Sequence, residues 1–158
     1  MDAKAAAVGE QVAIRPLAPQ DVGAVVRILG ESPEAANWSE KSIAESLGWR
    51  EVLSLVSELK GELTGFLIGR ATGEEAEILN IAVVPGRRRQ GDGGALLAAA
   101  LAEFKARGVK RVFLEVRDSN QQAIAFYNHA GFSKRGLRPG YYQGPAEAAV
   151  LLEKILTD

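Results

Sequence analysis

The chain has 158 residues, which is a typical length for one domain. Hydrophobic residues make up 47% and charged residues 25% of the sequence, and this balance excludes a disordered, collagen-like or coiled-coil protein. The 19 Lys and Arg residues nearly balance the 20 Asp and Glu residues, so the net charge of −1 creates no overall basic field that would attract nucleic acid or an anionic membrane. We therefore expect neither as a partner.

Two residue types that often carry chemistry are nearly absent. The sequence has no cysteine, which excludes disulfides, thiolate metal ligands and a cysteine nucleophile. Its only histidine is His129, so a site with several histidine ligands is also excluded, and we expect no metal. The lack of cysteine is compatible with a reducing cytoplasm, where we expect the protein to act.

Residues 1–10 predict a mobile N-terminal tail, and residues 11–158 predict a single folded domain. The first residues lack the apolar run of a secretory signal. The longest apolar run, residues 95–102, spans eight residues, whereas a membrane-spanning helix needs about 20. We therefore expect no association with a membrane.

The first half of the chain predicts a strand, two helices and three further strands. Residues 12–17 form the first strand, and apolar residues recur at helical spacing within residues 20–29. A second helix is predicted over residues 38–47, with Asn37 as its cap. Apolar runs separated by glycine turns then predict an antiparallel meander, over residues 52–57, 63–71 and 77–84.

A helix and a strand follow the meander. The helix is predicted to run from Gly94 to Gly108, where glycine supplies a left-handed stop. Residues 110–117 alternate between two faces as a strand does, which turns Glu115 to the face opposite Val112.

The C-terminal part predicts one more helix and a pair of strands. Ser119 and Gln122 have the spacing of a capping box for a helix over residues 119–130. Residues 132–142 and 147–155 predict the two strands. The order of elements predicts the α/β class, as a single domain with a mixed, twisted sheet of about six to seven strands and about four helices on both of its faces.

A glycine-rich loop between a strand and a helix is the most informative segment. The strand ends at Pro85, and three arginines followed by Gly91, Gly93 and Gly94 lead directly into the helix. Such a unit points backbone N–H groups and the positive end of the helix dipole outward, and glycine lets an anion approach the backbone. The loop therefore predicts an anion site, although a plain turn with a solvated arginine cluster explains the loop alone equally well.

Two common phosphate-binding loops do not match this segment. The P-loop needs a Lys-Ser or Lys-Thr pair after its last glycine, where this chain has Ala95. The dinucleotide-binding fingerprint needs three glycines at a different spacing, directly after a first strand.

The residues around the loop make its interpretation specific. Segment 79–85 (LNIAVVP), followed by Arg88-x-x-Gly91-x-Gly93 and a leucine-bearing helix, resembles the acetyl-CoA loop of the GCN5-related N-acetyltransferase (GNAT) superfamily. Segments 113–120 (FLEVRDSN), 123–127 (AIAFY) and 131–132 (GF) resemble the second signature of the same superfamily. Segment 38–42 (WSEKS) and the pattern Arg138-x-x-Tyr141-Tyr142 are similar to the RimI-like ribosomal-protein alanine N-acetyltransferases, and the resemblance covers about residues 12–155.

The resemblance implies an acetyl-CoA-dependent enzyme that acetylates the α-amino group of a protein N-terminus, with an alanine-starting ribosomal protein of the small subunit as the acceptor. Backbone groups of residues 81–83 would pair with the pantetheine arm, with Val83 near the thioester carbonyl, and residues 88–94 would hold the pyrophosphate. The residues implied to bind acetyl-CoA are Ile81, Ala82, Val83, Arg88, Arg89, Gln90, Gly91, Asp92, Gly93, Gly94 and Asn120. Those implied to contact the acceptor are Trp38, Tyr141 and Tyr142.

The resemblance also implies Glu115 as general base and Tyr127 as general acid. An α-amine has a pKa of about 7.7–8.0, so a single carboxylate can deprotonate it far more easily than a lysine with a pKa near 10.4. Because the chain has no cysteine, a cysteine-linked acetyl-enzyme is excluded. We therefore predict direct transfer in a ternary complex.

One departure from the pattern lies in the glycine-rich loop. Asp92 stands where the family usually has an apolar residue. A carboxylate beside a pyrophosphate costs electrostatic energy unless it points away or pairs with the arginines of residues 87–89, and in the first turn of a helix it also favours the dipole.

From the residues alone, other interpretations stay open. Glu115 can pair with Arg111 or Arg117, Tyr127 can be a core residue, and Asn120 can be a helix-cap residue. The acceptor can be a small-molecule amine or a lysine side chain, and the chain can be a non-catalytic acyl-CoA-binding module.

Overall fold

The computed structural model describes residues 11–33, 35, 38–143 and 146–157. The predicted tail and the predicted cap Asn37 lie outside these residues. Within them, no helix combines the length and the apolar content that crossing a membrane requires. The elements in chain order are β1 (Ala13–Pro16), the 3-10 helix η1 (Pro19–Asp21), α2 (Val22–Gly30), α3 (Glu40–Ser46), β2 (Val52–Leu59), β3 (Glu62–Thr72), β4 (Glu75–Val83), the 3-10 helix η2 (Pro85–Arg87), α4 (Asp92–Ala106), β5 (Arg111–Arg117), α5 (Gln121–His129), β6 (Ser133–Tyr142) and β7 (Glu147–Ile155).

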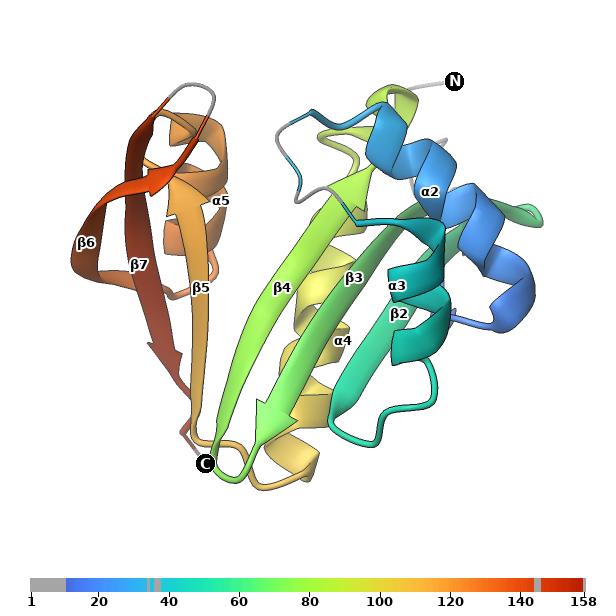
Figure 1. The fold of residues 1–158 in the computed structure, drawn as a ribbon. Helices are drawn as coiled ribbons and strands as arrows, with labels where there is room; N and C mark the ends of the chain where they lie inside the picture. Colours follow the sequence, from blue (N-terminus) through green and yellow to red (C-terminus); the bar gives the residue numbers. More distant parts are fainter. Residues whose placement is uncertain (1–10, 34, 36–37, 144–145, 158) are drawn as a thin grey trace, which may run out of the picture.

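The strands form one seven-stranded mixed sheet in the order β1-β2-β3-β4-β5-β7-β6. The pair β4–β5 is parallel and the other neighbouring pairs are antiparallel. Helices α2 and α3 lie on one side of the sheet and α4 on the other (Figure 1). The predicted α/β class, the number of strands and the placement of helices on both faces are confirmed.

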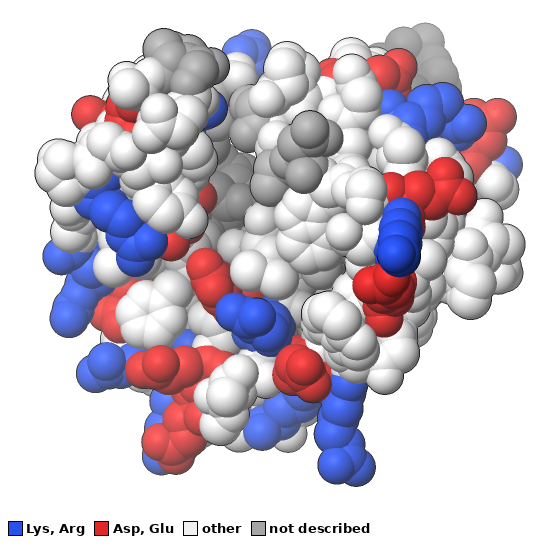
Figure 2. Space-filling model, viewed as in Figure 1, with Lys and Arg blue, Asp and Glu red and all other residues white. Residues whose placement is uncertain are grey.

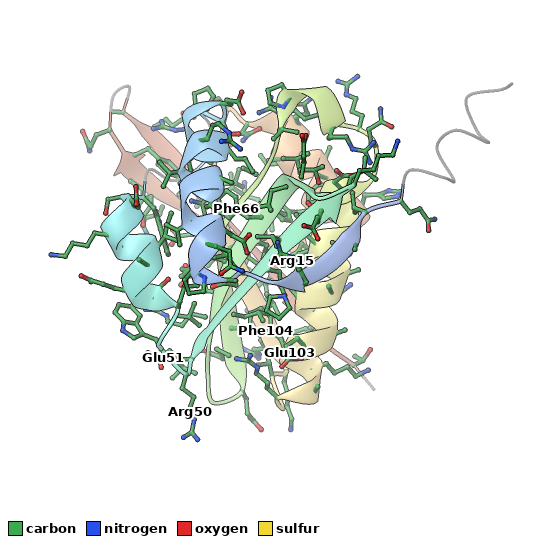
Figure 3. All side chains as sticks on the ribbon, turned by 90° about the vertical axis from the view of Figure 1, so that its right-hand side faces the viewer. Arg15, Arg50, Glu51, Phe66, Glu103 and Phe104 are labelled. Carbon is green, nitrogen blue, oxygen red and sulfur yellow. The ribbon has the colours of Figure 1, made fainter. Side chains whose placement is uncertain are left out.

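Each face of the sheet has its own apolar core, because side chains of a strand alternate between faces. Under α2 and α3, Phe66 packs with helix residues such as Val25 and Ile43. Under α4 and α5, Phe104 packs with residues such as Leu67 and Leu114. Figure 3 shows Phe66 on the α2 side and Phe104 on the α4 side. All six side chains are almost completely buried, and full burial of such a side chain stabilises the fold by about 1.5–3 kcal/mol.

The helix starts differ from those predicted. In α3 the cap is Ser39, whose Oγ accepts a hydrogen bond from the Ser42 backbone N–H at 3.1 Å, so this helix begins at Glu40. In α5 the cap is Asn120, whose Oδ1 accepts from the Ala123 backbone N–H at 3.1 Å. The predicted capping box that begins at Ser119 is therefore wrong by one residue.

Strand β4 contains one more residue than β3 over their shared ladder, and this β-bulge lies at Leu79. Because successive side chains alternate, one extra residue reverses the faces of all that follow. Ile78 faces the α4 core before the bulge, and Ile81 and Val83 face the same core after it. The bulge thus turns the end of β4 toward the start of α4.

Strands β4 and β5 pair over three positions, from Glu75 opposite Arg111 to Glu77 opposite Phe113. Beyond these pairs the two strands diverge (Figure 1). β5 meanwhile stays paired with β7 along its whole length. The sheet therefore opens in its middle, between the end of β4 and the end of β5.

Candidate active site

A cavity of about 1060 Å3 lies where β4 and β5 diverge. Its lining comes from both strands, the glycine-rich loop, α5, the segment before α3 and the end of β6. Figure 2 shows this face of the molecule, hollowed between the two groups of strands, with both acidic and basic side chains beside the hollow. The volume suits a ligand larger than a metabolite of a few atoms.

The cavity brings together nearly all the predicted site residues. Those that line it are Trp38, Ile81, Ala82, Val83, Arg88, Arg89, Gly91, Gly93, Gly94, Glu115, Asn120, Tyr127, Tyr141 and Tyr142. Gln90 and Asp92, which were predicted with them, are not among the lining residues.

The glycine-rich loop presents open backbone at the start of α4. Gly91 is the N-cap with a φ of 93°, a conformation that side-chain-bearing residues rarely adopt. Ala95 donates to the Gly91 carbonyl at 3.0 Å, so the N–H groups of the three preceding residues lie in the unpaired first turn. A Cβ built at Gly94 would meet nothing within 4 Å. This arrangement fits a diphosphate, which needs N–H donors and free space beside them.

Asp92 is removed from the cavity by an ion pair. Its side chain is buried, and Arg87 donates to it through Nε at 3.1 Å and Nη2 at 2.9 Å. The carboxylate is therefore neutralised within the loop and does not face a bound anion. The carboxylate thus both points away from the cavity and pairs with an arginine, and either arrangement would remove the electrostatic cost of a carboxylate beside a pyrophosphate.

The Arg88 side chain makes hydrogen bonds within the protein. Its Nε donates to the Val83 carbonyl at 3.2 Å, and its Nη2 donates to the Glu31 carbonyl and to Ser32 Oγ, both at 3.3 Å. The guanidinium thus ties the end of β4 to the segment that follows α2. The residue still lines the cavity.

Glu115 has a buried carboxylate oxygen without a hydrogen-bond partner. Among the described residues, no donor satisfies Glu115 Oε2, and Arg138 Nη1 contacts it at 3.5 Å. Of the two arginines considered above as partners of Glu115, Arg111 contacts Glu153 and Arg117 contacts Glu147. Buried polar atoms are nearly always satisfied, so an unsatisfied oxygen facing a cavity is typical of a group that binds a donor from outside.

Tyr127 is both a core residue and a lining residue. Its ring makes edge contacts with Phe126 and Phe132 at centroid distances of 5.0 and 5.6 Å, and 6% of the residue is exposed. Burial raises the pKa of Tyr127 well above its ordinary value. The phenol therefore stays protonated at any physiological pH and can act as a hydrogen-bond donor.

Aromatic residues form the rim of the cavity at the end of β6. The rings of Tyr141 and Tyr142 contact each other edge to face at 5.1 Å. The guanidinium of Arg117 lies 4.4 Å from the Tyr142 ring, and that of Arg138 lies 4.8 Å from the Tyr141 ring. These contacts hold both rings in place beside Glu115.

The interpretation of Asn120 as a helix-cap residue is confirmed, because its side-chain oxygen accepts a hydrogen bond from the first turn of α5. It lies at the cavity as well, so both interpretations of this position are compatible.

Sequence reasoning missed Glu77 and Arg87, which also line the cavity. Arg87 was visible only as one of three consecutive arginines. Prediction of the position of Glu77 requires the register between β4 and β5, which places this residue opposite Phe113. Alternation then puts it on the same face as Glu115.

In the part of the chain that the structure describes, no group of three or more His, Asp or Glu side chains lies close enough to hold a metal ion. The expectation of a metal-free site stays a prediction.

Residues 24–132 match the family model described as the acetyltransferase (GNAT) family. The chain belongs to this family, and it is an acetyl-CoA-dependent N-acetyltransferase built as a single domain of the GNAT fold. The predicted family and fold are thereby confirmed.

Individual relatives and solved structures are also similar to this chain. Ribosomal protein bS18-alanine N-acetyltransferase of Escherichia coli is 42% identical over 105 residues, which are 66% of this chain and 70% of the relative. The crystal structure of the ribosomal-protein-S18-alanine N-acetyltransferase from Escherichia coli has a TM-score of 0.82 and 33% identity, covering 93% of this chain and 95% of that one. Ard1 from Thermoplasma volcanium has a TM-score of 0.84 and 30% identity, with 94% and 99% covered.

Proposed function

We propose that this enzyme acetylates the α-amino group of a protein N-terminus that begins with alanine, and that its acceptor is a ribosomal protein in the cytoplasm. The observation that carries this proposal is the buried, unsatisfied Glu115 oxygen, which lies in one cavity with the glycine-rich loop and the aromatic rim. The names of the relatives from Escherichia coli support the choice of acceptor.

Two parts of the chain would hold acetyl-CoA. The N–H groups of residues 92–94 would bind the diphosphate at the positive end of α4, while the Arg87–Asp92 pair keeps the loop in shape. Residues 78–83 of β4 lie beyond the last pair with β5, so this edge can bind an extended arm as it would bind a strand. Acetyl-CoA supplies an acyl thioester, whose carbon–sulfur bond breaks as the bond from carbon to the amine nitrogen forms.

Two side chains that line the cavity, Glu115 and Tyr127, carry out the proton steps. Glu115 takes a proton from the α-ammonium group, because its buried oxygen accepts no hydrogen bond from the described residues. A backbone N–H at the end of β4, near Val83, stabilises the negative charge that develops on the carbonyl oxygen.

Tyr127 donates to the leaving sulfur. It gives its proton to the thiolate sulfur, and the second proton lost by the nitrogen passes to the Tyr127 oxygen and restores the phenol, whose raised pKa keeps it protonated between turnovers. The proton held by Glu115 is released to solvent. The neutral products are the N-acetylated terminus and the free thiol of CoA.

The aromatic rim would contact the first residues of the acceptor. Trp38 approaches the cavity from the segment before α3, and Tyr141 and Tyr142 from the end of β6. We expect a protein N-terminus bound at Glu115 to contact these side chains, whereas a small amine needs no such contacts.

A panel of acceptors tests this proposal. Initial rates are measured with a peptide that begins with alanine, with the same peptide N-acetylated and carrying one internal lysine, and with a polyamine. We expect kcat/KM to be about two orders of magnitude higher for the free N-terminus, since the neutral amine is about 300-fold more abundant in an α-amine than in lysine at neutral pH. Preference for the polyamine or the lysine peptide would exclude N-terminal acetylation as the main activity.

A further inference from the structure

The end of β6, which carries the tyrosines of the aromatic rim, is only partly held by the sheet. The register of β6 with β7 is interrupted between Arg138 and Tyr142. Their partners on β7 are Ala149 and Glu147, so residues 139–141 correspond to a single residue of β7. The backbone of β6 therefore leaves the regular ladder where the rim lies, and contacts outside the ladder are needed to fix the position of the two rings.

Arg117, at the end of β5, makes such contacts. Its Nη2 donates to the Gln143 carbonyl at 3.3 Å, and its guanidinium lies 4.4 Å from the centroid of the Tyr142 ring. Arg117 follows Glu115 by two residues, so the two side chains lie on the same face of β5, and both line the cavity. The guanidinium thus connects the rim with the strand that carries Glu115.

Glu147, at the start of β7, holds this guanidinium from outside the cavity. Its Oε1 accepts a hydrogen bond from Arg117 Nη1 at 3.0 Å, and the side chain is 19% exposed. The same carboxylate accepts from the backbone N–H and the Oγ of Ser119. The hydrogen bonds from Arg117 and Ser119 hold the pKa of Glu147 below its ordinary value of 4.5, so the carboxylate is ionised at neutral pH. Glu147 is not among the residues that line the cavity.

We propose that Glu147 is a positioning residue for the acceptor: through Arg117 it fixes the orientation of the Tyr142 ring, and it thereby sets how tightly the residues behind the reactive amine bind. This inference rests on the proposed function. It assigns the preference for a peptide over a small amine to a side chain that touches neither.

A role limited to stability would have a different signature. Without the charge of Glu147, Arg117 keeps its hydrogen bond to the Gln143 carbonyl, but one such bond does not define the plane of a guanidinium on a flexible side chain. The Tyr142 ring then has more freedom, and ordering it on binding weakens the affinity for an acceptor that contacts it. A pair that only stabilised the fold would change the free energy of unfolding and would not distinguish one acceptor from another.

The test compares two acceptors with the same reactive group. Initial rates at saturating acetyl-CoA are measured for the wild type and for Glu147→Gln, with the alanine-starting peptide and with alaninamide, which presents the same α-amine without the residues that follow. We expect Glu147→Gln to raise KM for the peptide by about 3-fold to 30-fold, within the range of coupling between residues of one hydrogen-bond network. The peptide kcat, and both constants for alaninamide, should stay within about twofold of the wild type.

Ser119→Ala is the matched control, because it removes one contact of the same carboxylate and leaves the hydrogen bond from Arg117 in place. This variant should have the KM of the wild type for both acceptors. An unchanged peptide KM in Glu147→Gln, or an equal loss with alaninamide, would overturn the proposal.

A double-mutant cycle with Tyr142→Ala tests the route by which Glu147 acts. If Glu147 acts through this ring, Glu147→Gln has no further effect on the peptide KM once the ring is absent. Full additivity of the two substitutions would refute the proposal, even where Glu147→Gln also lowers stability.

The result is separable from that of the acceptor panel. If the panel identifies a different amine as the best acceptor, the proposed function fails, and the cycle is measured with that amine. The coupling between Glu147 and Tyr142 then still decides this inference.

Discussion

Glu115 is the residue at which chemistry and folding are most easily separated. Its buried oxygen accepts no hydrogen bond from the described residues, so the folded state gains little from the charge at this position. Gln has the same shape without the charge. Glu115→Gln should therefore lower kcat by about 10²–10⁴, the usual contribution of a general base, with the affinity for acetyl-CoA unchanged. Stopped assays and calorimetric titration measure the two quantities.

A second carboxylate provides the control for this prediction. Glu153 is buried and also has an oxygen without a hydrogen-bond partner among the described residues, but it contacts Arg111 and Arg135 and is not a lining residue. Glu153→Gln should leave kcat unchanged. Comparable loss of activity in both variants would mean that Glu115 acts through the structure of the sheet and not as the base.

The residues of the site were predictable to different degrees. Positions 81–83, the loop glycines and Glu115 were predicted from short motifs that resemble the family, and all of them line the cavity. Glu77 was not predictable, since its place depends on the register of a parallel pair between segments far apart in the chain. The side-chain direction of Arg88 was also not predictable, because its acceptors Glu31 and Ser32 lie more than 50 residues earlier.

At the scale of elements, the start of α5 shows how tertiary contacts override local preference. Ser119 and Asn120 are both good cap residues. Glu147 of β7 accepts hydrogen bonds from the Ser119 backbone N–H at 3.0 Å and from its Oγ at 3.1 Å. Ser119 is thereby held by β7, and the cap falls to Asn120.

The loop before α4 depends on the buried pair of Arg87 and Asp92. Removal of one partner leaves a buried charge without its counter-ion, which typically costs about 3–5 kcal/mol, whereas replacement of both by apolar residues is often neutral. We therefore expect Asp92→Ala to lower the free energy of unfolding markedly and to weaken acetyl-CoA binding. The double variant Arg87→Met with Asp92→Leu should recover most of the stability, as measured by urea unfolding.

The single variant Arg87→Met completes this comparison. If the loss of unfolding free energy in the double variant equals the sum of the losses in the single variants at Arg87 and Asp92, the two residues do not act as a pair. The loop would then owe its shape to its glycines alone.

At the scale of the whole molecule, an ion-pair cluster near the N-terminal edge of the sheet couples stability to pH. Arg15 on β1 contacts Asp21 of η1 at 2.7 Å and Glu58 of β2 at 3.3 Å. The hydrogen bonds from Arg15 hold the pKa of Asp21 below its ordinary value of 3.8. The stabilisation is therefore fully present above pH 4 and is lost as the pH falls through the lowered pKa of Asp21.

Chemical unfolding at several pH values measures this effect. The free energy of unfolding should fall between pH 4 and the acid limit in the wild type, and Asp21→Asn should be less stable at neutral pH but show a smaller fall. Glu77 acts in the opposite direction, because its pKa is raised in the folded state. The comparison is therefore best made in the Glu77→Gln background, where an unchanged slope in Asp21→Asn would contradict the assignment.

The extra residue at Leu79 has a consequence for how this enzyme can vary. A deletion there would keep β4 apolar and of ordinary strand length, yet it would exchange the outward and inward side chains of residues 80–83 and move their N–H groups to the other edge. The two cores would still have enough apolar residues, but different backbone atoms would face the edge where we propose that the pantetheine arm binds. We therefore expect the number of residues in this strand to matter for catalysis as well as their chemical identity.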